Sequence, residues 1–70
     1  MKAQLTKRQS QILDFIKAEI EETGLPPTRR EIADKFKWSS SYSAQCHLEL
    51  MQKKGVIKLS KLISRGIQVL

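Results

Sequence analysis

The stretch that most constrains the fold is KWSS, residues 37–40, because it lies between two segments that carry helical signals. Before it, Thr28 opens the pattern TRRE of a capping box, so a helix is expected over about residues 28–36. After it, Ser40 or Ser41 suits the N-cap of a further helix. Four residues allow only a sharp reversal of direction, and the sequence therefore predicts two helices joined by a tight turn.

A longer helix is expected before these two, over about residues 6–22. Thr6 and Gln9 form another capping-box pattern at its start, and Gly24 is placed to adopt the left-handed conformation that ends a helix. Apolar residues recur within it at helical spacing, namely Ile12, Leu13, Phe15, Ile16 and Ile20. Two prolines then prevent the helix from continuing.

The third helix is expected over about residues 40–54, with Ala44, Leu48 and Met51 forming one narrow buried seam. After Gly55 the period changes, and residues 56–70 contain two short segments rich in β-branched residues, which predict a two-stranded hairpin. Residues 1–70 are thus expected to form one domain, mainly α with a small β-hairpin. Three helices followed by a two-stranded wing are typical of a winged helix-turn-helix.

Charge narrows the class of partner. Thirteen Lys and Arg against seven Asp and Glu give a net charge of +6, which favours a polyanion, either nucleic acid or an anionic membrane. The single cysteine excludes an internal disulfide and fits a reducing cytosol. The N-terminus lacks the apolar region of a signal peptide, and no apolar run approaches the roughly 18 residues of a membrane span. A cytoplasmic protein without a membrane partner is expected.

The start of the third helix has the composition of a surface that contacts DNA bases. Residues 40–47 offer small and hydrogen-bonding side chains, as a recognition helix in the major groove requires. Cations flank this segment on both sides, namely Arg29, Arg30, Lys37, Lys53, Lys54 and Arg65. Phosphate contacts position a protein and base contacts give specificity, so this arrangement favours DNA binding. The structural alternative is that the serines only cap the helix and that Tyr42 and Gln45 are merely solvated.

The segments LTKRQ, TGLPPTRREIADKF, KKGVIK and SRGI together resemble the N-terminal DNA-binding domain of the LexA repressor family over essentially the whole chain. In that family the domain is a winged helix-turn-helix that binds operators of DNA-damage-response (SOS) genes as a dimer. The resemblance implies a bacterial, nucleoid-associated transcriptional repressor. Two copies of the domain would bind a palindromic operator of double-stranded DNA as a dimer. In the absence of DNA, the domain would be monomeric or only weakly dimeric. The family's Ser-Lys self-cleavage domain lies outside this sequence, so no enzymatic activity is expected.

The resemblance also assigns contacts residue by residue. Four residues of the third helix match base-contacting positions: Tyr42, Ser43, Gln45 and Cys46. Nine residues match positions at the phosphate backbone: Arg8, Gln9, Thr28, Arg29, Ser40, Lys53, Lys54, Ser64 and Arg65.

The chain departs from the family around the expected recognition helix. The family usually resembles LGFRSPNAAEEHL where this chain has FKWSSSYSAQCHL. Lys37 takes the place of a glycine, and a left-handed conformation there is expected to cost about 1 kcal/mol. Gln45 and Cys46 take the places of two glutamates. Glutamate accepts a hydrogen bond from cytosine N4, whereas glutamine suits adenine N6 and N7. One bidentate pair discriminates against the wrong base by about 1–3 kcal/mol. We therefore expect DNA binding with altered operator specificity.

Other chemistry has little support. Cys46 and His47 are adjacent, so on a helix their side chains diverge by about 100° and no metal site is expected. Cys46 is interpreted as a contact to a thymine methyl group, a passive thiol or a redox-sensitive residue, and Tyr42 as a base or sugar contact or a cover over the helix start. Trp38 is expected in the core. No catalytic set is present, and no cofactor or small-molecule ligand is expected.

Two further hypotheses stay open. The chain is alternatively a protein-interaction module that uses an apolar wing tip at Leu62 and Ile63. It is otherwise a fragment of a longer self-cleaving repressor, with DNA binding weakened by the missing dimerisation domain.

Overall fold

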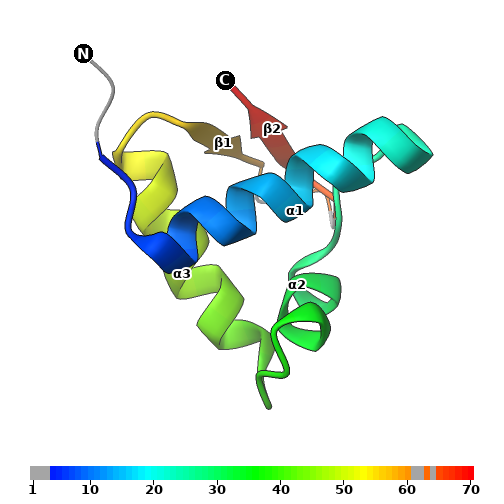
Figure 1. Ribbon diagram of the computed structural model, residues 1–70, viewed down its shortest axis with the longest axis horizontal. Helices are drawn as coiled ribbons and strands as arrows, with labels where there is room; N and C mark the ends of the chain where they lie inside the picture. Colours follow the sequence, from blue (N-terminus) through cyan, green and yellow to red (C-terminus); the bar gives the residue numbers. More distant parts are fainter. Residues whose placement is uncertain (1–3, 61–62, 64) are drawn as a thin grey trace.

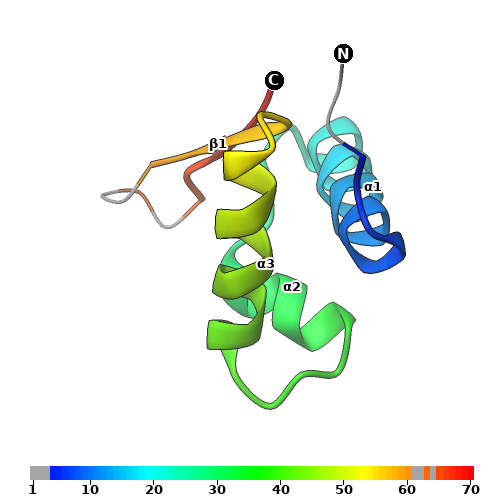
Figure 2. The same ribbon diagram turned by 90° about the vertical axis from the view of Figure 1, so that its left-hand side faces the viewer.

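The computed structural model describes residues 4–60, 63 and 65–70. Along the chain lie α1 (Lys7–Thr23), α2 (Arg29–Lys35), α3 (Ser41–Lys53), β1 (Ile57–Leu59) and β2 (Ile67–Val69). Figure 1 shows α1 crossing the domain, with α2 below it and α3 at the left. In Figure 2, α3 faces the viewer, and the hairpin and α1 lie on opposite sides of it. This arrangement confirms the predicted mainly α fold of a winged helix-turn-helix. Within the described part of the chain, no helix has the length and apolar character needed to cross a membrane.

Both predicted capping boxes are present. The Thr6 hydroxyl accepts from the Gln9 amide at 3.1 Å, and Gln9 Oε1 accepts from the Thr6 amide at 3.1 Å. Thr28 and Glu31 form the same pair of bonds, at 3.0 and 2.9 Å. The two threonines lie outside the helices as caps, so α1 and α2 each begin one residue later than expected. Each cap contributes about 0.5–2 kcal/mol.

The turn between α2 and α3 is a Schellman motif. The Trp38 amide donates to the Ala33 carbonyl at 2.8 Å, and the Lys37 amide donates to the Asp34 carbonyl at 3.2 Å. Lys37 has a φ of 60°, the left-handed conformation that glycine adopts more easily. The left-handed conformation expected at Lys37 is therefore confirmed. The Ser40 hydroxyl then accepts from the Tyr42 amide at 3.1 Å, and α3 begins.

The core lies where the helices meet the hairpin. Ile12 and Ile16 of α1 have no exposed surface, and neither does Ile32 of α2. The predicted seam of α3 is confirmed, because Ala44, Leu48 and Met51 are all fully buried. Ile57 and Ile67 complete the cluster from the two strands. Burial of one such large side chain stabilises the fold by about 1.5–3 kcal/mol.

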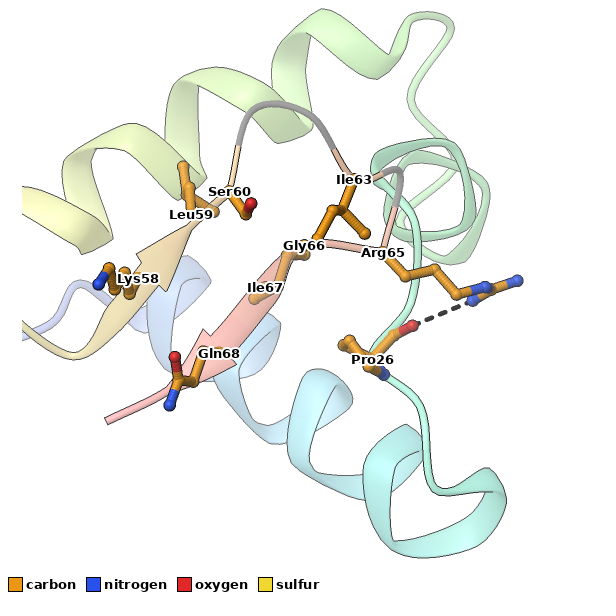
Figure 3. A pocket seen from close by; sticks show the side chains of 9 residues that line it. All are labelled: Pro26, Lys58, Leu59, Ser60, Ile63, Arg65, Gly66, Ile67 and Gln68. Carbon is orange, nitrogen blue, oxygen red and sulfur yellow. Dashed lines mark hydrogen bonds between the residues drawn. The ribbon is translucent and has the colours of Figure 1, made fainter.

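The two strands pair antiparallel, with Lys58 opposite Gln68. They are shorter than the two expected segments, although the Leu70 amide still donates to the Val56 carbonyl at 3.0 Å. Gly66 is required by close packing, because a Cβ atom there would lie 2.6 Å from the Ser60 carbonyl oxygen. The hairpin thus extends the core and places Arg65 beside Pro26, in the segment before α2 (Figure 3).

Candidate nucleic-acid interface

The outer face of α3 carries three of the four residues predicted to contact bases. Tyr42, Gln45 and Cys46 lie on it, opposite the buried seam, because their spacing places them on one side of a helix. Tyr42 is 71% exposed and the Cys46 thiol is free and exposed, which places both at the surface. Ser43 is half-buried on the flank of this face. The first two turns of α3 therefore present hydrogen-bonding groups to solvent.

Gln45 is held between two other side chains. Arg29, the first residue of α2, donates from Nε to Gln45 Oε1. Gln45 Nε2 donates to Glu49 Oε2, one turn further along α3. The sequence indicated Arg29 and Gln45 separately, but it did not predict that they bond to each other. It missed Glu49, whose signal was its spacing of four residues from Gln45.

Tyr42 is a neutral hydrogen-bond donor. The hydrogen bond between its side chain and Cys46 raises the pKa of Tyr42 above its ordinary value of 10.0, and the charge of Glu49 adds to this effect. A protonated phenol both donates and accepts hydrogen bonds. Tyr42 is therefore chemically suited to contact a base or a sugar near the N-terminus of α3.

Several of the residues predicted to contact the DNA backbone already have partners within the chain. Gln9 is buried, and its Oε1 accepts from Lys54 Nζ at 2.7 Å as well as from its own capping box. The Arg8 guanidinium lies over the Phe36 ring, 5.1 Å from its centroid. Lys53 is exposed on the last turn of α3. The caps Thr28 and Ser40 use their hydroxyls on helix amides.

Arg65 joins the wing to the start of α2. Its guanidinium contacts both carboxylate oxygens of Glu31, at 2.7 and 3.1 Å, and donates to the Pro26 carbonyl at 3.0 Å (Figure 3). The hydrogen bond from the Arg65 guanidinium stabilises the ionised carboxylate of Glu31 and lowers its pKa, and the hydrogen bond from the Thr28 amide lowers it further. The remaining wing residue predicted to contact phosphate, Ser64, lies outside the described residues.

Aromatic rings form a stack beside the turn. Trp38 lies between Phe36 and His47, with ring centroids 5.1 Å from each, and Phe15 meets Phe36 edge to face. Trp38 therefore packs against the core, as predicted. His47 is its polar neighbour, and the buried Nδ1 of His47 has no hydrogen-bond partner in the described part of the chain.

A shallow hollow of about 480 Å³ lies between the hairpin and the segment before α2 (Figure 3). Leu59, Ile63 and Arg65 are among the residues that line it, and Ile63 is 58% exposed. Ile63 is one of the two apolar wing residues on which the protein-interaction hypothesis rests. The other, Leu62, lies outside the described residues.

Comparison with known proteins connects this geometry to a family. Residues 1–66 match the protein-family model of the LexA DNA binding domain. The chain is 52% identical to a LexA repressor of Colwellia psychrerythraea over 65 residues, which make up 93% of this chain and 31% of that protein. It is 50% identical to a LexA repressor of Edwardsiella ictaluri over 70 residues, which make up 100% of this chain and 34% of that protein. The chain thus spans about a third of the length of the curated relatives it matches. These matches do not favour the protein-interaction hypothesis, and the chain belongs to the LexA DNA-binding domain family.

Proposed function

We propose that the chain binds double-stranded DNA sequence-specifically, as the operator-binding part of a bacterial transcriptional repressor of the SOS type. The observation that carries the proposal is the exposed polar face of α3, held against α2 by a tight turn and preceded by Arg29. The major groove of B-DNA admits a helix of this kind, and there each base pair presents a distinct pattern of donors and acceptors.

In the proposed complex, α3 lies in the major groove. Tyr42, Ser43, Gln45 and Cys46 face the base edges. The flanking groups contact phosphates: Arg8, Gln9, Thr28, Arg29, Ser40, Lys53, Lys54, Ser64 and Arg65. Because several of these groups also bond within the chain, they would contact phosphate with the hydrogen-bonding capacity that remains.

Two copies are proposed to bind a palindromic operator in the bacterial cytoplasm. A single domain of 70 residues covers only a few base pairs with one helix, so a second copy is the simplest way to extend the recognised sequence. Half-sites would then be separated by about one helical turn of DNA. Gln45 and Cys46 make the operator of this chain differ from that of relatives with glutamates at these positions.

Selection of bound sequences from a random duplex library, with the purified chain, tests the proposal. A palindromic sequence is expected to be enriched, and the double variant Tyr42→Ala, Gln45→Ala should lose the selectivity while keeping salt-dependent binding. With six to ten phosphate contacts, affinity should fall by roughly 10³- to 10⁵-fold between about 50 and 200 mM salt. Binding that shows no sequence preference and no salt dependence would refute the proposal.

A further inference from the structure

The chemistry of its two partners fixes the orientation of the Gln45 side-chain amide. Nε of Arg29 carries a hydrogen and can only donate, so it must face the amide oxygen. The carboxylate of Glu49 can only accept, so it must face the amide nitrogen. Turning the amide over would place donor against donor at one end and acceptor against acceptor at the other. The two bonds therefore select one of the two orientations of the side chain.

The bonds leave part of the amide free. An amide oxygen has two acceptor positions and an amide nitrogen has two hydrogens, and each atom of Gln45 uses one of them here. One acceptor and one donor remain on a side chain that lies on the exposed face of α3. Adenine offers the complementary pair in the major groove, with N6–H as donor and N7 as acceptor.

We propose that Glu49, together with Arg29, is a positioning residue that orients the Gln45 amide for adenine at one base pair of the operator. Glu49 has no direct contact with the base in this arrangement and acts through Gln45. The inference rests on the proposed function, since it names how one base pair of that operator is selected. Without Glu49, the nitrogen end of Gln45 loses its partner on the protein, and only the Arg29 bond at the oxygen end still restrains the amide.

Electrostatics alone predicts a different outcome, which makes the inference testable. Removing the carboxylate of Glu49 makes the chain more positive, so affinity for any DNA sequence rises. This change in affinity is the same for a matched and a mismatched operator, so it cancels in the ratio of their two dissociation constants. Loss of the Gln45 orientation instead lowers the ratio of mismatched to matched dissociation constants, and does so at one base pair only.

Two variants separate these effects at equal charge. Glu49→Ala removes the acceptor, whereas Glu49→Gln keeps an oxygen acceptor at the same reach. Dissociation constants would be measured by fluorescence anisotropy for the operator selected by the wild-type chain. The same measurement would be made for duplexes in which each A·T pair is replaced in turn, and circular dichroism would confirm folding of both variants. The pair contacted by Gln45 is the one whose replacement no longer matters in Gln45→Ala.

At that pair, Glu49→Ala should lower the discrimination of the wild-type chain by up to the range of one bidentate contact, roughly 5- to 150-fold. Glu49→Gln should retain most of it, and discrimination at the other pairs should be unchanged in both variants. Equal discrimination in the two variants, whether kept or lost, would overturn the inference. Failure of the wild-type chain to select any sequence would overturn the proposed function instead.

Discussion

Replacement of Lys37 by glycine should stabilise the domain. Lys37 occupies the position after the cap of α2 with a φ of 60°, and its side chain is exposed. A left-handed conformation costs a residue with a Cβ atom about 1–2 kcal/mol. Glycine avoids this cost but loses more backbone entropy on folding, by about 0.5–1 kcal/mol. Taken at their midpoints, the two effects leave a net gain of about 0.75 kcal/mol for Lys37→Gly, or roughly 3–6 °C in Tm.

Urea unfolding measures this gain. Trp38 is the single tryptophan of the chain and lies directly after the turn, so its fluorescence reports the turn, while circular dichroism reports the helices. The two signals should give one midpoint, shifted upwards without a change in slope. Lys37→Ala is the matched control, because it removes the same charge but keeps a Cβ atom. If Lys37→Gly proves no more stable than Lys37→Ala, the strain assigned to this turn is wrong.

Three other predictions concern stability. Gly66→Ala should cost about 1–3 kcal/mol in urea unfolding, because the new Cβ atom would lie 2.6 Å from the Ser60 carbonyl oxygen; an unchanged midpoint would show that the wing adjusts freely. Leu48→Ala should cost about 2–5 kcal/mol, since Leu48 is fully buried, and a loss below about 1 kcal/mol would contradict its place in the core. The pKa of Glu31 is lower in the folded chain than its ordinary value of 4.5. The stability that its ion pair with Arg65 gives to the fold is therefore fully present above pH 4.5, and it is lost as the pH falls through the folded pKa. The stability difference between wild type and Glu31→Gln, followed by thermal unfolding from neutral to acidic pH, should be constant above that value and narrow below it; a difference that widens in acid would contradict this account.

Signals that act within one helical turn could be predicted from the sequence. The capping boxes at Thr6 and Thr28 depend on partners three residues away, and Gly24 ends α1 through its own left-handed conformation, with a φ of 83°. The buried seam of α3 follows from helical spacing alone. The left-handed conformation at Lys37 was expected from comparison with the glycine usual in the family, and the structure confirms that conformation.

Contacts between distant side chains could not be predicted in the same way. Arg65 and Glu31 are 34 residues apart, and Arg29 and Gln45 are 16 apart. Each pair forms only because the turn and the hairpin bring two elements together. The sequence identified Arg65, Arg29 and Gln45 as candidate DNA contacts, but it gave no sign that they also bond within the protein. Their contacts with DNA stay predictions.

The first turn of α2 links α3 and the wing, the two elements that we propose to contact DNA. α2 has seven residues, of which only Ile32 and Ala33 are buried, so apolar packing alone holds it weakly. Its N-terminal residues add polar links in two directions. Arg29 bonds to α3 through Gln45, and Glu31 bonds to the wing through Arg65. Both α3 and the wing are thus bonded to the N-terminal end of α2. A substitution at Arg29 or Glu31 is therefore expected to move an element that we propose to contact DNA, as well as to change a charge.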